Sequence, residues 1–287
     1  MRSLLFVPAD SERKLAKGRE SGADVLILDL EDSVAAARRP EARRLARGFL
    51  AAPRAGGQRY YVRVNPLASE APLADLAAVM PGRPDGIMLP KSTPGDLRRL
   101  DHYLAAFEAA AEIPLGDTRI VAIATETPEA VFALGGYRGV TPRLEGLTWG
   151  AEDLAAVLGA ANRRPDGAYD DVFRLARALC LLGAHAAGVA AIDTVFTDFK
   201  DDKGLEAECA AARRMGFTGK MAIHPAQVAV INGAFAATAE ELAWARQVVE
   251  AFAADPAAGA IGIGGKMIDR PHLVLAERIL ARAGEKR

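Results

Sequence analysis

The chain has 287 residues, of which 51% are hydrophobic and 25% are charged, and its formal net charge is −1. There is enough apolar sequence for one large domain or two ordinary ones, and the balanced charge argues against a protein that binds nucleic acid or a membrane surface, since both usually carry a basic excess or patch. The two cysteines lie inside predicted helices, and neither a signal-peptide core nor an apolar stretch of about 18 residues is found, so we expect a cytoplasmic protein without disulfides.

Short apolar segments alternate with longer amphipathic ones along most of the chain, as is typical of βα units. The predicted strands span residues 3–7, 25–30, 60–64, 86–89, 120–124, 146–149, 191–196 and 221–223. The predicted helices span residues 11–20, 40–51, 72–80, 94–112, 128–135, 151–160, 169–187, 203–215 and 225–235. The strands are continuous apolar runs, as expected of parallel strands covered on both faces.

Eight βα units in about 240 residues predict a (β/α)8 TIM barrel, with a catalytic domain at residues 1–236. The alternative is a doubly wound open sheet, which would more often carry a glycine-rich phosphate-binding turn after its first strand. The first predicted strand is followed by Ala9-Asp10-Ser11, which is no such turn.

Residues 237–287 are predicted to form a C-terminal helical extension that acts as a lid or arm. It contains a long helix at 239–253, a glycine-rich segment at 259–265 and a last helix at 270–283. The glycines predict a mobile hinge, which would let the last helix act as a lid or pack on a neighbouring subunit. The pattern equally allows a helix docked on its own barrel.

Polar side chains stand at the ends of most predicted strands, where the functional residues of such barrels collect. After the second to eighth strands the polar residues include Asp29, Glu31, Asp32, Arg63, Asn65, Lys91, Glu126, Asp153, Asp198, Lys200 and His224. Glu126 and Asp153 end successive strands, and one or two carboxylates completed by water and substrate are typical Mg²⁺ ligands. We therefore predict a metal site at these two residues; the alternative is that they are only polar strand ends or first-turn helix charges.

Arg63 lies on an otherwise apolar strand, and a buried guanidinium needs an anion beside it. That anion is either a local carboxylate or, as we favour, a carboxylate or developing oxyanion of the substrate. The acids at positions 29, 31 and 32 bind a metal, hold its waters or serve as helix-start charges; the role near the waters is preferred because Mg²⁺ keeps several of them. Lys91 meets a phosphate or carboxylate, or is solvated.

No CxxC, HExxH or Walker loop is present, and no Ser-His-Asp or Cys-His arrangement can be argued from the sequence. His224 is followed by proline and is more typical of a structural histidine than of a base. The groups that remain as candidates for catalysis are a metal, an arginine and acids. This set suits reactions that pass through an enolate, because a cation polarises an oxygen, a guanidinium neutralises developing charge and a carboxylate moves a proton.

Motifs along the whole chain resemble the citrate lyase beta-subunit-like proteins, a family that includes malyl-CoA and citramalyl-CoA lyases, the lyase subunit of citrate lyase, and relatives with thioesterase or malate-synthase-like activity. The motifs are RSLLFVP at 2–8, LILDLEDSV at 26–34, VRVN at 62–65, LPK at 89–91, TET at 125–127, WGAEDL at 149–154, AID at 191–193, KMAIHP at 220–225 and GKMID at 265–269.

This resemblance implies a (β/α)8 barrel, a homo-oligomer (usually a trimer, or a hexamer), and Mg²⁺ held by Glu126 and Asp153. Arg63 matches an arginine that contacts the substrate at the reacting carbonyl. Asp269 matches an acid/base aspartate supplied by the C-terminal segment of a neighbouring subunit, which favours the arm over the docked helix. Many family members have a glycine after the first proline, where this chain has Ala9, so the details of cofactor contact differ.

In the family, coenzyme A runs along the barrel mouth with its phosphates near basic residues of the first loop. The candidates here are Arg13, Lys14 and Lys17. Glu31 and Asp32 match positions around the water shell of the metal, and we include them with the catalytic residues.

The resulting prediction is a Mg²⁺-dependent carbon–carbon lyase that cleaves or forms a 3-hydroxyacyl-CoA thioester, such as malyl-CoA or citramalyl-CoA, by a Claisen-type mechanism. Arg63 and Asp269 are the principal catalytic residues and Lys91 is a further substrate contact. Two alternatives stay open: the lyase subunit of a citrate lyase complex acting on an acyl-carrier-protein thioester, and a class II pyruvate-type aldolase acting on free oxoacids.

Overall fold

The computed structural model describes residues 1–54 and 56–285. The chain divides into two compact units, Met1–Phe235 and Ala236–Arg287.

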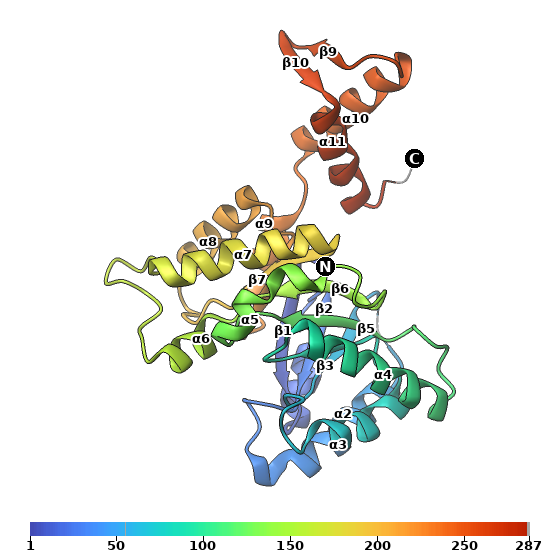
Figure 1. Ribbon diagram of the computed structural model, residues 1–287, viewed down its shortest axis with the longest axis vertical. Coiled ribbons are helices and arrows are strands. Elements are labelled where there is room, and N and C mark those ends of the chain that lie inside the picture. Colours follow the sequence, from blue (N-terminus) through green and yellow to red (C-terminus); the bar gives the residue numbers. More distant parts are fainter. Residues whose placement is uncertain (55, 286–287) are drawn as a thin grey trace. The chain divides into compact units, whose positions relative to one another are not determined.

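Within the described part of the first unit, eight parallel strands close into a barrel in chain order, with β8 paired to β1 (Figure 1). The strands are β1 (Ser3–Pro8), β2 (Val25–Asp29), β3 (Arg59–Arg63), β4 (Gly86–Leu89), β5 (Arg119–Ile123), β6 (Leu144–Thr148), β7 (Ala190–Asp193) and β8 (Gly219–Ala222). This confirms the predicted (β/α)8 barrel. The seventh strand is shorter than predicted because β8 pairs with it only through Ile192 and Asp193.

Helices surround the strands and follow the predicted order. They are α1 (Glu12–Arg19), α2 (Arg39–Ala51), α3 (Pro72–Val79), α4 (Pro94–Ala110), α5 (Pro128–Phe132), α6 (Ala151–Leu158), α7 (Asp171–Ala187), α8 (Asp202–Met215) and α9 (Gln227–Phe235), with 3-10 turns η1 (Ala36–Arg38), η2 (Met80–Gly82) and η3 (Leu134–Tyr137). The single helix predicted at 128–135 is in fact α5 followed by η3.

Alternation along the strands decides which side chains reach the barrel interior, since successive residues of a strand point to opposite faces. Val25 and Ile27 of β2, with Tyr61 of β3, belong to the apolar cluster inside the barrel. The period of two then puts Asp29 and Arg63 on the same inner face, at the ends where the strands stop. The fold therefore turns two charged side chains inward above an apolar core.

The second unit contains α10 (Ala239–Ala254), β9 (Ala260–Ile263), β10 (Lys266–Asp269) and α11 (Arg270–Arg282). The glycine-rich segment is not the predicted hinge, because β9 and β10 form an antiparallel hairpin. Gly264 and Gly265 form its two-residue loop with φ of 56° and 75°. Two consecutive positive φ angles are what a type I′ turn requires, and glycine adopts them without strain.

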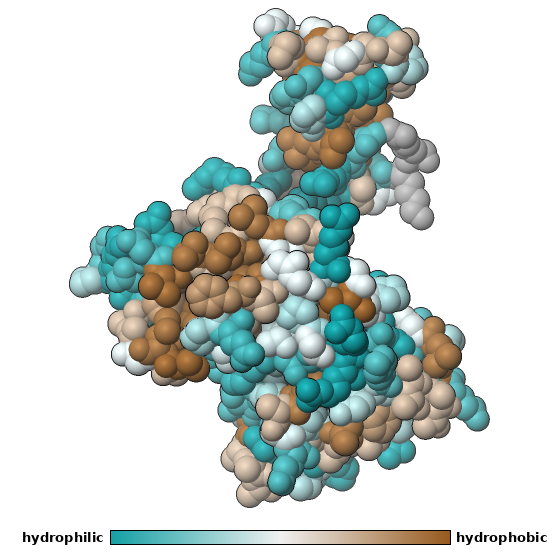
Figure 2. Space-filling view, viewed as in Figure 1, coloured by the Kyte–Doolittle hydropathy of each residue, from teal (hydrophilic) through white to brown (hydrophobic). Residues whose placement is uncertain are grey.

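One side of the barrel exposes large apolar side chains, which we call the α5–α7 apolar face. Its residues are Phe132, Val157, Leu175 and Leu182, and Phe132 is 91% exposed. Figure 2 shows apolar surface gathered over α5, α6 and α7. Contiguous exposed apolar surface is typical of a protein–protein interface.

The two cysteines are free thiols buried in the barrel unit, Cys180 on α7 and Cys209 on α8. Among the helices of the described residues, none is long and apolar enough to cross a membrane.

Candidate active site

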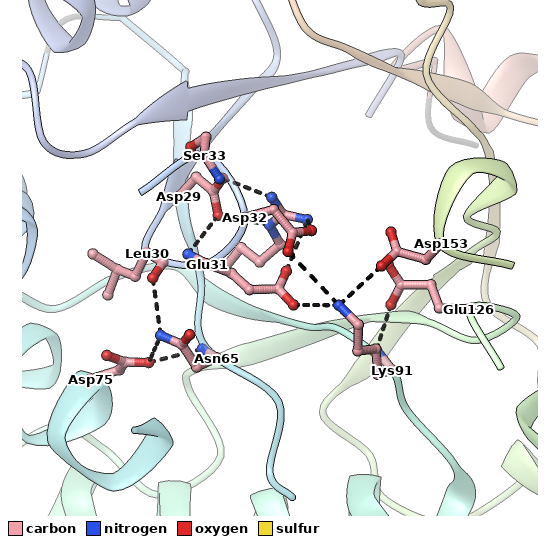
Figure 3. A network of polar contacts seen from close by, with 11 residues as sticks. Asp29, Leu30, Glu31, Asp32, Ser33, Asn65, Asp75, Lys91, Glu126 and Asp153 are labelled. Carbon is pink, nitrogen blue, oxygen red and sulfur yellow. Dashed lines mark hydrogen bonds and ion pairs between the residues drawn. The ribbon is translucent and has the colours of Figure 1, made fainter. Parts of the chain in front are cut away.

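The ends of β2 to β6 bring six of the predicted site residues into one polar network (Figure 3). These residues are Glu31, Asp32, Arg63, Lys91, Glu126 and Asp153. Because all the strands are parallel, the loops that carry these side chains leave the barrel at the same end.

Arg63 is buried and fixed by carboxylates. Its Nε and Nη2 each donate to Asp29 at 2.7 Å, and its Nη1 lies 3.0 Å from Glu31 and 3.3 Å from Asp32. The guanidinium carbon stands 4.7 Å from the centre of the Phe6 ring. Burial alone would lower the pKa of Arg63, but the bonds and charge of Asp29 raise it above its ordinary value.

The local carboxylates are thus anionic partners of Arg63, the option that the sequence analysis ranked second. Asp29 was predicted to lie near the waters of a metal, and it instead pairs with Arg63. A contact between Arg63 and a substrate stays a prediction.

Glu31 bridges Arg63 and Lys91. Its Oε1 accepts a hydrogen bond from Lys91 Nζ at 2.7 Å, and its Oε2 faces Arg63. Burial raises the pKa of Glu31 to about 7, although the charges of Arg63 and Lys91 oppose that shift. Lys91 has a φ of 48° in the left-handed region, which is rare for a residue other than glycine and often marks a functional position.

Glu126 and Asp153 lie side by side and both contact Lys91. The Lys91 backbone N–H donates to Glu126 at 2.5 Å, and its ammonium lies 3.1 Å from Asp153. Glu126 is only 2% exposed, and burial followed by the charge of Asp153 raises its pKa well above the ordinary value. Two carboxylates confined in this way fit a divalent cation, which would offset their repulsion.

No group of three or more His, Cys, Asp or Glu side chains suited to a metal occurs among residues 1–54 and 56–285. A complete protein cage is therefore not the design of this site. The pair of Glu126 and Asp153 suits Mg²⁺ better than metals that need four side-chain ligands, because Mg²⁺ keeps several waters and is commonly bound through one or two carboxylates.

Gly150 lies between β6 and α6, close to the segment after β5 that carries Glu126. Its N–H donates to the Thr125 hydroxyl at 3.0 Å, and a Cβ atom built on it would lie 2.7 Å from the Cγ of Glu126. A residue with a side chain would therefore push Glu126 away. In the sequence, Gly150 stands between the predicted strand at 146–149 and the predicted helix at 151–160.

Four other predicted site residues are not part of this network. Arg13, Lys14 and Lys17 are exposed on α1. Asp269 lies in the second unit, where it precedes α11 and its Oδ1 is 2.5 Å from His272 Nδ1. Their predicted roles toward coenzyme A and toward a neighbouring subunit stay predictions.

Two residues support the rim: Asn65, which was predicted only as a polar strand end, and Asp75, which was not predicted. Asn65 donates from its backbone and side-chain nitrogens to Asp75 at 2.8 Å, and its side chain also donates to the Leu30 carbonyl at 3.0 Å. Asp75 is fully buried on α3. The available signal was a lone acid in the apolar helix PLADLAAV, since a buried carboxylate needs partners.

Comparisons with known proteins find relatives that match nearly the whole chain. Residues 2–225 match the family model described as HpcH/HpaI aldolase/citrate lyase. A citrate lyase subunit beta-like protein of Mycobacterium tuberculosis is 38% identical over 282 residues, covering 98% of this chain and 95% of that protein. A (3S)-malyl-CoA thioesterase of Cereibacter sphaeroides is 36% identical, covering 98% of this chain and 94% of its own length.

Among solved structures, the CitE protein of M. tuberculosis in complex with magnesium, acetoacetate and coenzyme A is similar with a TM-score of 0.79. It is 36% identical, and the match covers 99% of this chain and 98% of that one. The chain therefore belongs to the HpcH/HpaI aldolase/citrate lyase family.

Proposed function

We propose that this chain is a Mg²⁺-dependent carbon–carbon lyase that cleaves or forms a 3-hydroxyacyl-CoA thioester such as malyl-CoA or citramalyl-CoA. The observation that carries the proposal is the meeting, at one end of the barrel, of the Glu126 and Asp153 carboxylates with Lys91 and the buried Arg63. The CitE relative was solved with magnesium and coenzyme A, and the C. sphaeroides relative is named a (3S)-malyl-CoA thioesterase. Both findings support the same ligands for this chain.

Glu126 and Asp153 would hold the cation, which when bound supplies Lewis-acid polarisation of the oxygens of the oxoacid portion. Arg63 faces the developing negative charge on the thioester oxygen, and its fixed guanidinium stabilises that charge without reorganising. Lys91 pairs with the carboxylate of the substrate. Arg13 and Lys14, exposed on α1, would meet the phosphates of coenzyme A.

In the cleavage direction, Asp269 of a neighbouring copy takes the proton of the 3-hydroxyl group. The bond between C2 and C3 then breaks, C3 becomes the carbonyl carbon of the oxoacid, and the electron pair passes into the thioester enolate beside Arg63. The enolate carbon takes up a proton and leaves as an acyl-CoA. This scheme requires a homo-oligomer, which we propose to be a trimer or a hexamer.

Hydrolysis of the same thioester is the second candidate, and the relative named as a malyl-CoA thioesterase favours it. The name of the citrate lyase subunit beta-like relative keeps an acyl-carrier-protein thioester as an alternative substrate. Free coenzyme A among the products would identify hydrolysis, because carbon–carbon cleavage alone leaves the thioester intact.

The test is to incubate the protein and Mg²⁺ separately with malyl-CoA and citramalyl-CoA. We expect an oxoacid (glyoxylate or pyruvate, followed as its phenylhydrazone) and acetyl-CoA in equal amounts from at least one of them, and loss of turnover with EDTA. Release of pyruvate from a free hydroxy-oxoacid, with no cleavage of either thioester, would instead identify the aldolase.

A further inference from the structure

Asp29 has all its acceptor capacity in use. Among the described residues, its carboxylate accepts from Arg63 Nε and Nη2 (both 2.7 Å), from the backbone N–H of Glu31 (3.0 Å), and from the hydroxyl (2.5 Å) and N–H (3.2 Å) of Ser33. An ionised carboxylate offers about four lone-pair positions. Asp29 is 1% exposed and lies directly opposite Arg63 in the pairing of β2 with β3.

These contacts argue against two other roles for Asp29. A metal ligand needs an open lone pair, and each oxygen of Asp29 already accepts at least two hydrogen bonds. An acid or base must exchange a proton near neutral pH. Burial alone would raise the pKa of Asp29, yet the bond and charge of Arg63 hold it below its ordinary value.

Arg63 in turn is fixed on two sides. Asp29 occupies the Nε–Nη2 edge of the guanidinium in a two-point geometry, and the Phe6 ring lies against its face at 4.7 Å. The edge at Nη1 points to Glu31 and Asp32, the residues closest to the network around Lys91. A fork held by two parallel bonds cannot rotate in its plane without breaking one of them.

We propose that Asp29 is a positioning residue: it sets the plane and direction of the Arg63 guanidinium so that the Nη1 edge faces the reacting oxygen of the substrate. This inference rests on the proposed function for the identity of that substrate. Asp29 itself touches neither substrate nor metal, and acts only through Arg63.

A double-mutant cycle tests the proposal. Lysine cannot form the two-point pair, so Arg63→Lys removes what Asp29 positions. We expect Asp29→Asn to lower kcat about 10- to 100-fold with a smaller change in KM, since misplacing a group by about 1 Å can cost that much. In Arg63→Lys protein the same substitution should change kcat less than about threefold, because the two effects share one interaction.

Glu108→Gln is the matched control. Glu108 is fully buried, pairs with Arg143 at two points, and accepts from the backbone of Gly116 and Thr118 before β5 begins, at the other end of the barrel. The Glu108→Gln substitution should lower the midpoint of thermal unfolding, as Asp29→Asn does, and leave kcat unchanged. The positioning role would be overturned if Asp29→Asn lowered kcat equally in wild-type and in Arg63→Lys protein. It would also be overturned if Glu108→Gln lowered kcat in proportion to its loss of stability.

Ser33→Ala covers the case in which Asp29→Asn does not fold. It removes one short bond to Asp29 from an exposed side chain, and we expect a kcat loss of about threefold that vanishes in Arg63→Lys protein. An unchanged kcat in Ser33→Ala would then overturn the proposal.

If the wild-type protein cleaves no thioester, the proposed function fails on its own, and the cycle is measured as calorimetric binding of pyruvate with Mg²⁺. Asp29→Asn should then weaken pyruvate binding with Arg63 present and leave it unchanged in Arg63→Lys protein. Equal weakening in both would overturn the positioning role even so.

Discussion

Glu126 has an electrostatic environment that disfavours its charged form. Its carboxyl is buried and lies beside the charge of Asp153, and both raise its pKa. Because a metal ligand must be deprotonated, Mg²⁺ binding should release protons and weaken as the pH falls through the pKa of Glu126. The residue is therefore suited to a bound cation rather than to an isolated charge.

Asp153→Ala tests the metal site. We expect loss of Mg²⁺-dependent turnover with an unchanged fold, because Asp153 is half-buried at the start of α6 and supports no core packing. Activity against Mg²⁺ concentration, calorimetry and circular dichroism measure this. Glu152→Ala, one residue earlier and exposed, should behave as wild type. Full activity in Asp153→Ala would remove the metal site at this position.

Gly150→Ala tests the close approach to Glu126. The added Cβ would meet the Glu126 Cγ at 2.7 Å, so we expect Glu126 to shift and kcat to fall roughly 10- to 100-fold. Gly48→Ala, in α2 with nothing within 4 Å, is the control and should leave kcat unchanged. A crystal structure or Mg²⁺ titration of Gly150→Ala with wild-type properties would contradict this account.

At the residue level, the sequence predicted which side chains meet but not how they pair. Arg63 and its acids were identified because a charged residue in an apolar strand is conspicuous. The saturation of Asp29 depends on the β2–β3 register and on the turn that returns Ser33, and neither follows from residue types alone. The left-handed backbone of Lys91 had no sequence signal, since glycine is the usual residue there.

Among the elements, the turn from β6 to α6 is fixed by a buried polar network between the barrel strands and the surrounding helices. Trp149 donates to Asp193 at 2.7 Å, and Asp193 also pairs with Arg177 at 2.9 Å and with Lys220 at 3.0 Å. Lys220 reaches Glu208 of α8 at 2.7 Å. This buried network joins β6, β7, β8, α7 and α8 just before the segment that carries Asp153.

Asp193→Asn tests how much this network stabilises the barrel. Removing the charge leaves the buried Arg177 without its carboxylate partner and leaves the buried Lys220 with Glu208 alone, so we expect a loss of about 3–5 kcal/mol in the free energy of unfolding at pH 7. Urea denaturation measures it. Asp171→Asn, exposed on α7, should cost under about 0.5 kcal/mol.

The pH dependence has a definite sign. Burial alone would raise the pKa of Asp193, but Lys220 and Arg177 hold it below the ordinary value. Its stabilisation is therefore complete above the unfolded pKa of about 3.9 and is lost as the pH falls through the lower folded value. The difference between wild type and Asp193→Asn should shrink only in that acidic range. A difference that already shrinks between pH 7 and 5 would contradict this assignment.

The elements themselves were largely predictable. Continuous apolar runs located the strands, because both faces of a barrel strand are covered. The hairpin of β9 and β10 was missed because the glycines were interpreted as flexibility, whereas Gly264 and Gly265 supply the positive φ angles of a tight turn. Short strands with few apolar neighbours give a weak periodic signal.

At the scale of the whole molecule, the proposed mechanism needs Asp269 from another copy. We expect Arg63→Ala and Asp269→Ala to be inactive alone. When the two variants are mixed in equal amounts and exchange subunits, about a quarter of the sites would combine Arg63 of one copy with Asp269 of the next. Activity should then recover to about a quarter of the wild-type value. Steady-state turnover before and after exchange measures it.

The double variant mixed with wild type is the control. A site shared between copies leaves about a quarter of all sites complete, whereas a site within one copy leaves about half. No recovery in the first mixture, with half the activity in the second, would show that Arg63 and Asp269 act within one chain.

The buried thiols give this barrel a built-in reporter of its own opening. Cys180 of α7 and Cys209 of α8 are buried on the side held by the Asp193 network, and burial raises the pKa of the Cys209 thiol to about 12. Because the thiolate is the reactive form, alkylating reagents should label neither cysteine until those helices detach. The rate of labelling by iodoacetamide in dilute denaturant would thus time the release of this side of the barrel without any added probe.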